Sequence, residues 1–159
     1  MAEPVFPLIS IDNDGVFDII LSAVAFSNAS TRILTNTTYF DKIELFDRNS
    51  CKWKHRQVSA DLKNNWLTKL LANTVYDPIL NTKVIWTFDV IYQMNELKEK
   101  LKDCVDKDDD IITQFEEADA IKASIGKATN FDEILIVLNK YVFDVDEEQL
   151  WNEQQARGQ

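Results

Sequence analysis

The acidic residues between positions 106 and 117 have the spacing of a calcium-binding loop. An EF-hand supplies oxygen ligands at loop positions one, three and five and a bidentate glutamate at position twelve, because calcium takes six to eight hard oxygen ligands. The matching residues are Asp106, Asp108, Asp110 and Glu117. Position six turns sharply and requires glycine, whereas this chain has Ile111, which is costly in the left-handed conformation. The pattern therefore favours a solvated acidic loop over a calcium site.

Acid–base chemistry in this chain would have to use His55, its only histidine. A single histidine excludes a multi-histidine metal site, and neither a G-x-S-x-G segment nor a cysteine–histidine signature accompanies it. The neighbouring residues Lys52, Trp53, Lys54 and Arg56 are typical of an exposed sheet face with a buried tryptophan. We therefore predict a surface histidine and no catalytic residue.

The same stretch, residues 52–56, is the one basic and aromatic segment of the sequence. Such a combination can stack a nucleic-acid base while contacting phosphate. The net charge of −10 repels nucleic acid outside this segment, however. With three glycines in all, the chain has no glycine-rich phosphate loop, and a turn explains residues 12–15, Asp-Asn-Asp-Gly, without a metal. We expect no nucleic-acid partner, no cofactor and no metal.

Acidic side chains gather in the last third of the chain. Residues 101–159 carry fifteen acids against six bases, whereas residues 1–100 carry twelve acids and eleven bases. A concentrated negative field speeds encounter with basic proteins, although a solvated face without function is the alternative reading. The residues that we expect to contact a basic protein partner are Asp106, Asp108, Asp109, Asp110, Glu116, Glu117, Asp119, Asp144, Asp146, Glu147 and Glu148.

Strand signals dominate the first 92 residues. The expected strands are residues 5–11, 16–26, 42–46, 52–58 and 83–92. Pro7 suits an edge position in the first, because proline cannot donate to a strand ladder. The run 16–26 is apolar on nearly every side and is either a buried strand or a buried helix, with its β-branched residues favouring strand. Residues 42–46 and 52–58 form a hairpin around a five-residue loop, and 83–92 is expected to be central.

Three amphipathic helices are also predicted. They cover residues 61–72, residues 94–105 and a segment opened by a capping box, in which the Asn130 side chain accepts from the backbone N–H of Glu133. Residues 111–125 alternate only weakly between helix and irregular structure. Because strands precede helices, we expect an α+β fold, with a mostly antiparallel sheet from the N-terminal part and helices packed on one face.

Length and composition predict a single domain. A chain of 159 residues with 45% hydrophobic residues suits one core, which we place in residues 1–150, followed by a polar, frayed tail at 151–159. Cys51 and Cys104 have no metal or redox spacing, and their pairing is left open. Residues 1–7 show no leader pattern, and no apolar stretch approaches the ~18 residues of a membrane span. A cytoplasmic protein without a membrane partner is expected.

In overall character the chain resembles the immunity proteins of bacterial toxin systems, including those of contact-dependent inhibition. The resemblance is carried by the α+β order of elements, by Trp66 and Trp86 in the middle elements, and by the acids of residues 103–119 and 144–148. It rests on character and on no motif, so it transfers no individual residue. It implies a bacterial, cytoplasmic and non-enzymatic protein that neutralises a basic toxin or nuclease by electrostatic docking.

Two other classes of function are left open. One is a small α+β enzyme or ligand-binding protein, with a pocket between sheet and helices lined by Trp53, Trp66, Trp86 or Tyr92. The other is an accessory domain that forms homodimers through an exposed apolar patch around Trp151. The sequence does not indicate the oligomeric state.

Overall fold

The computed structural model describes residues 3–36, 38–64, 77–107, 112–113 and 116–141. By its internal contacts the chain separates into two compact units. The first holds residues 1–13 and 18–91 and contains the sheets. The second holds residues 14–17 and 92–159 and contains the longer helices.

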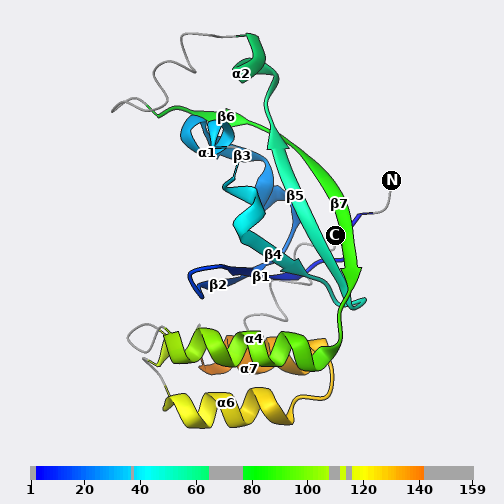
Figure 1. Ribbon diagram of the computed structural model, residues 1–159, viewed down its shortest axis with the longest axis vertical. Coiled ribbons are helices and arrows are strands. Elements are labelled where there is room, and N and C mark those ends of the chain that lie inside the picture. Colours follow the sequence, from blue (N-terminus) through cyan, green and yellow to red (C-terminus); the bar gives the residue numbers. More distant parts are fainter. Residues whose placement is uncertain (1–2, 37, 65–76, 108–111, 114–115, 142–159) are drawn as a thin grey trace, which may run out of the picture. The chain divides into compact units, whose positions relative to one another are not determined.

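A five-stranded sheet forms the body of the first unit, in the order β2-β1-β4-β5-β7. Its strands are β1 (Leu8–Asp12), β2 (Phe17–Ile20), β4 (Ile43–Phe46), β5 (Cys51–Val58) and β7 (Lys83–Ile91). The pairs β1–β4, β4–β5 and β5–β7 are antiparallel. The two long strands β5 and β7 lie side by side (Figure 1), with a register shift between Lys52 and Trp53. The expected hairpin of β4 and β5 is confirmed.

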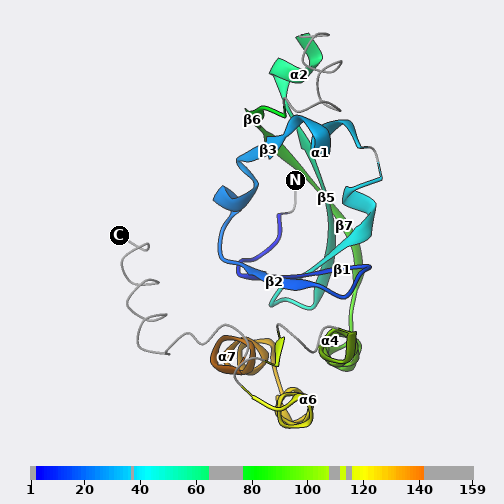
Figure 2. The same ribbon diagram turned by 90° about the vertical axis from the view of Figure 1, so that its left-hand side faces the viewer.

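A two-stranded sheet and several short helices complete the first unit. β3 (Asn28–Ser30) pairs antiparallel with β6 (Ile79–Asn81). The short helices are η1 (Ala23–Phe26), α1 (Thr31–Thr35), η2 (Phe40–Lys42) and α2 (Ala60–Asn64). Figure 2 shows the strands and η1 curving around a common interior. Its hydrophobic core consists of Leu8, Phe26, Leu45 and Trp53.

β5 directs side chains alternately into and out of this interior. Trp53, His55 and Gln57 are buried, whereas Lys54 and Arg56 are exposed. Successive side chains of a strand point to opposite faces of the sheet, so the three buried residues share one face. The expected strand with one wet face and one packed face is therefore confirmed, and its packed face carries side chains with polar atoms.

Three details of the first unit differ from the sequence-based expectation. β1 begins at Leu8, directly after Pro7, and lies between β2 and β4 rather than at an edge, because a proline outside the ladder does not restrict the strand. The run 16–26 is only partly strand, since β2 ends at Ile20 and η1 begins at Ala23. β7 is an edge strand rather than the central one. The β-branched and aromatic composition of β7 indicates that it forms a strand, but not whether the strand is central or at the edge of the sheet.

The second unit contains α4 (Met94–Lys107), α6 (Ala118–Lys127) and α7 (Phe131–Tyr141). α6 contacts both of the other helices. Buried apolar residues recur at helical spacing in α4 and α7, which confirms the helices predicted there. α6 buries only Ile121 and Ile125, and this narrow stripe explains the weak helical signal of its sequence. The buried side chains of the three helices include Leu97, Leu101, Val105, Ile121, Ile125, Ile134 and Leu138.

The predicted capping interaction opens α7. The backbone N–H of Glu133 donates to Asn130 Oδ1 at 2.9 Å. The Glu133 carboxylate in turn accepts from the backbone N–H of Thr129 at 2.6 Å, one residue earlier than a capping box predicts. The Thr129 hydrogen bonds lower the pKa of Glu133 below its ordinary value. The start of the helix is confirmed, with Thr129 as an additional partner.

The combination of antiparallel sheets with helices is the expected α+β fold. The predicted helix 61–72 is described only in part, as α2, and the predicted tail 151–159 lies outside the described residues. Neither Cys51 nor Cys104 forms a disulfide in the described part of the chain. No described helix has the length and apolar character needed to cross a membrane.

Candidate functional site

Two of the acids predicted to bind a basic partner meet around one lysine. Asp106 lies in the last turn of α4 and Asp119 in the first turn of α6. Lys122 Nζ lies 2.6 Å from Asp106 Oδ1 and 3.2 Å from Asp119 Oδ1. Its hydrogen bonds with these carboxylates raise the pKa of Lys122. Part of the negative charge of this cluster is therefore balanced within the second unit.

The other described acids of the prediction lie just before α6. Glu116 accepts a hydrogen bond at 3.1 Å from the backbone N–H of Glu117, and Glu117 directly precedes the helix. Within the described residues from 92 to 141, nine acids face seven bases. Most of the acidic excess therefore belongs to residues outside the described ones, which include Asp108, Asp109, Asp110, Asp144, Asp146, Glu147 and Glu148. In the described parts of the chain no three carboxylate, histidine or cysteine side chains are grouped as metal ligands.

The basic segment 52–56 does not present its lysines together. Lys52 is buried, forms an ion pair of 2.5 Å with Glu44 and lies 5.3 Å above the Phe46 ring. Lys54 is exposed and pairs with Asp89 of β7 at 3.5 Å. Each of the two lysines is therefore paired with a carboxylate of a neighbouring strand, and the expectation of no nucleic-acid contact there stays a prediction.

β7 presents apolar side chains to solvent along its length. Ile85 is 45% exposed, Val90 48% and Ile91 70%. Phe88 is also 49% exposed, although its ring packs edge-to-face against Trp53 at 5.8 Å. A long strand at a sheet edge is a ready template for another chain, and natural proteins usually protect such edges with charges or bulges. β7 has one such feature, at Asp89, which the register with β5 skips, and the exposed apolar side chains lie on both sides of it. β7 is therefore the main candidate contact surface of the first unit.

His55 is buried, which corrects the predicted surface position. Its side chain is only 6% exposed. The ring packs against Phe26 at 4.9 Å, Phe40 at 5.1 Å and Trp86 at 6.0 Å between centroids. Burial lowers the pKa of His55 to about 4, so the imidazole is neutral at pH 7. Its basic neighbours suggested exposure, but the signal for burial was present, because His55 stands two residues from Trp53 on one strand.

Two pockets of the first unit meet at His55. The smaller has a volume of about 170 Å³ and is lined by residues of β1, β3, β4, β5 and the short helices between them. The larger, of about 310 Å³, is lined by Leu34, Asn36, Phe40, Asp41, His55 and Arg56. His55 Nδ1 is buried and has no hydrogen-bond partner within the described structure. The His55 side chain therefore lines both pockets, and its Nδ1 makes no hydrogen bond within the described structure.

Gln57 fixes the η1 end of the smaller pocket. Its Nε2 donates to the Phe26 carbonyl at 2.6 Å and to Thr82 Oγ1 at 3.2 Å. The Thr82 hydroxyl donates to the same Phe26 carbonyl at 2.5 Å. Phe26, which packs on His55, is therefore held by β5 and by the residue between β6 and β7.

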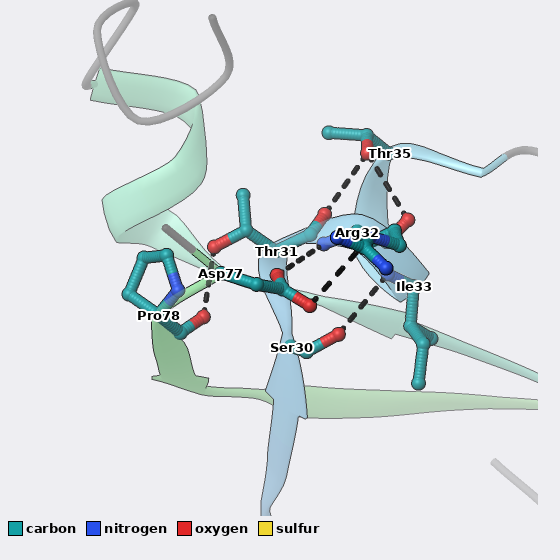
Figure 3. A network of polar contacts seen from close by, with 7 residues as sticks. All are labelled: Ser30, Thr31, Arg32, Ile33, Thr35, Asp77 and Pro78. Atoms are coloured by element: carbon teal, nitrogen blue, oxygen red, sulfur yellow. Dashed lines mark hydrogen bonds and ion pairs between the residues drawn. The ribbon is translucent and has the colours of Figure 1, made fainter. Parts of the chain in front are cut away.

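A second polar network holds α1, which supplies Ile33 to the smaller pocket and Leu34 to the larger. Figure 3 shows this network around the start of the helix. Ser30 Oγ accepts from the Ile33 backbone N–H at 3.3 Å, and Asp77 accepts from the Arg32 N–H at 2.9 Å. The Thr31 hydroxyl donates to the Pro78 carbonyl at 2.8 Å. A five-residue helix has little stability alone, so these contacts with the β6 segment position the pocket wall.

Of the aromatic residues predicted to line a pocket, the three that the structure describes, Trp53, Trp86 and Tyr92, do not line these two. Trp53 belongs to the hydrophobic core, Trp86 packs behind the His55 ring, and Tyr92 is buried in the second unit. Trp66 and Trp151 lie outside the described residues. The residues that sequence reasoning missed are His55 and Gln57, whose alternation with Trp53 was their only signal.

Comparisons with protein-family models, with curated proteins and with solved structures found no match, so the functional assignment rests on the arrangement of these residues.

Proposed function

We propose that this chain is a non-enzymatic, cytoplasmic protein-binding module, an immunity-type inhibitor that neutralises a basic toxin or nuclease. Edge strand β7 supplies the contact surface, and the acids of residues 101–159 attract the partner. The single observation that carries the proposal is the exposed apolar edge formed by Ile85, Val90 and Ile91.

The geometry of β7 suits recognition by another protein. Within the described part of the chain this nine-residue strand pairs only with β5, so its second edge can accept a partner strand. Backbone hydrogen bonds along such an edge supply affinity, and side chains exposed beside it supply specificity. Apolar side chains near the centre of an interface contribute most of the binding energy, while charges at the rim mainly set the association rate.

The charge of the chain favours a basic protein over a second copy of itself. Each copy carries a net charge of −10, so two copies repel one another at low salt. A basic protein is instead attracted, and its encounter accelerates as ionic strength falls. The acids Asp106 and Asp119 lie at helix ends, where side chains are accessible to a partner.

The test begins with capture of the partner from a lysate of the source cells at low salt and at about 0.5 M salt, where the Debye length is only a few ångströms. The captured protein is identified by mass spectrometry, purified and titrated against the chain by calorimetry. The proposal expects a basic protein whose gene lies directly upstream of the gene for this chain and whose toxicity is suppressed by co-expression. An acidic partner, or binding that does not weaken with salt, contradicts the charge argument.

Variants of β7 test the contact surface itself. The double variant Ile85→Lys and Ile91→Lys should weaken binding by about tenfold or more, because apolar contacts at the edge are replaced by charges that repel a basic partner. Val24→Lys is the matched control, since Val24 is 74% exposed but lies in η1. Equal affinity of all three proteins would place the interface away from β7. Light scattering reports whether the bound species is instead a homodimer.

A further inference from the structure

The larger pocket at His55 lies beside an open edge of β5. Its volume is about 310 Å³, and its lining includes both His55 and Arg56. Consecutive residues of a strand point to opposite faces of the sheet, so a pocket that touches both of them lies beside the strand. Phe40 and Asp41 of η2, which directly precedes β4, also line it, so this is the edge toward β4. The pairing of β5 with β4 ends at Trp53, and no other described strand pairs with that edge.

This edge offers one backbone donor and one backbone acceptor. In a strand the N–H and C=O of one residue point to the same edge, and those of the next residue point to the opposite edge. One of the two residues His55 and Arg56 therefore directs both groups to the side of the pocket, and the other directs them to β7. Apart from the β5–β7 ladder, no described group forms a backbone hydrogen bond with either residue. The N–H and C=O on the pocket side are therefore available to a ligand.

Two opposite charges lie at the same pocket. Arg56 and Asp41 both line it, and both side chains are exposed. Within the described part of the chain neither of them forms an ion pair, so they do not neutralise one another. They come from different walls, Arg56 from β5 and Asp41 from η2. A small ligand with one anionic and one cationic group is complementary to this arrangement.

The remaining walls are partly apolar. Leu34 comes from α1, and the buried Phe40 comes from η2. Asn36, the last lining residue, ends α1, and its Oδ1 accepts from the backbone N–H of Thr38 at 3.2 Å and from the Thr38 hydroxyl at 3.0 Å. Pockets for small molecules have volumes from about 300 Å³ upward, so this one suits a compact ligand with an apolar group.

We propose that this pocket binds a free apolar α-amino acid as its zwitterion. Arg56 and the backbone N–H at the β5 edge hold the carboxylate, and Asp41 and the backbone C=O hold the ammonium group. The aliphatic side chain of the ligand packs against Leu34 and Phe40. The pocket contains no residue of β7, so this binding activity is separate from the proposed protein contact.

Leucine and two analogues of the same carbon skeleton are the probes. Isocaproate lacks the ammonium group, and isopentylamine lacks the carboxylate. His55 is the only histidine, so an untagged chain labelled with ¹⁵N in histidine alone gives one backbone amide resonance beside the pocket. Leucine should shift it saturably, with half-saturation on the order of 1 mM for so small a ligand. Each analogue should bind at least about tenfold more weakly, because it loses the charge-assisted hydrogen bonds at one end.

Variants of the two charged residues assign the ends of the ligand. Arg56→Gln should weaken leucine at least about tenfold without weakening isopentylamine, which has no carboxylate. Asp41→Asn should weaken leucine by a similar factor without weakening isocaproate. Lys54→Gln is the matched control, since Lys54 is exposed on the same strand but does not line the pocket, and it should bind leucine as the wild type does.

Three outcomes would overturn the proposal. Equal binding of leucine and both analogues would show that the charged groups of the ligand are not recognised. Leucine binding that is unchanged in Arg56→Gln and in Asp41→Asn would place the site elsewhere. No saturable shift with leucine would show that the pocket does not take an amino acid.

Discussion

Trp53 and His55 are two residues apart on the buried face of β5, yet only Trp53 has its buried ring N–H hydrogen-bonded, whereas Nδ1 of His55 has no described partner. The Trp53 indole N–H donates to the Asp47 carboxylate at 2.8 Å. The same carboxylate, itself buried, accepts from the backbone N–H groups of Asn49 and Cys51 at 2.9 Å each. His55 has aromatic neighbours on several sides and an unused nitrogen.

This difference separates a polar group buried with its hydrogen-bond partners from one buried without a described partner. Asp47 and Trp53 close the β4–β5 turn, so every polar contact there has a structural consequence. His55 contributes packing, but its Nδ1 is desolvated without a described hydrogen bond in return, which is unfavourable for stability. The Asp47–Trp53 region should therefore be sensitive to loss of hydrogen bonds, and the His55 region should be sensitive to pH.

Replacing Asp47 should produce the largest loss of stability. Asp47→Ala leaves the N–H donors of Trp53, Asn49, Cys51 and Val5 without this acceptor, and we expect the free energy of unfolding to fall by roughly 3 kcal/mol or more. Urea unfolding measures this change. Asp47→Asn keeps one acceptor oxygen and should show a smaller loss. A loss below about 1 kcal/mol for Asp47→Ala would show that the network contributes little to the fold.

Acid should expose the contribution of His55. Its pKa is about 4 in the folded chain and 6.5 in the unfolded chain, so the unfolded chain binds the extra proton between these pH values. Stability is therefore complete above pH 6.5 and falls by on the order of 3 kcal/mol as the pH drops to about 4. The measurement is urea unfolding of the wild type and His55→Phe at several pH values. Because carboxylates titrate in both proteins, the difference between the curves isolates His55, and parallel curves would refute its burial.

Variants of Gln57 test the buried face of β5 where it contacts η1. Gln57→Leu removes the 2.6 Å hydrogen bond to the Phe26 carbonyl, while the Thr82 hydroxyl still donates to that carbonyl. We expect a loss of about 1 kcal/mol, since one of two donors remains. Thr82→Val should cost a similar amount. If the double variant loses no more than the larger single loss, the two donors do not substitute for one another.

The sequence predicts this face in part. Alternation along β5 correctly placed Trp53 inside and Lys54 outside, and the same alternation implies a buried His55. Burial of His55 nevertheless depends on Phe26 and Phe40, which come from short 3-10 helices that have no periodic signal. The register shift in the β5–β7 pair and the ion pair of the buried Lys52 with Glu44 are equally absent from the pattern.

The position of β7 shows a second limit of sequence reasoning. Its apolar residues indicate a strand in any position, and only the pairing of β1 with β4 and of β4 with β5 leaves β7 at the edge. Pairings between strands distant in sequence are not encoded in local composition. The helices of the second unit were predicted correctly because helical spacing and capping depend on residues close together in sequence.

The smallest effect is expected where polar groups lie at a helix end. In the second unit Asn130 accepts from the Glu133 N–H at 2.9 Å on an exposed surface, where water can replace the lost acceptor. Asn130→Ala should therefore cost only about 0.5–1 kcal/mol in urea unfolding, well below Asp47→Ala. Asn130→Ser, which retains a capping oxygen, is the control and should recover most of this loss. A loss as large as that of Asp47→Ala would mean that burial does not set the sensitivity to polar substitution, and the contrast drawn within β5 would need another cause.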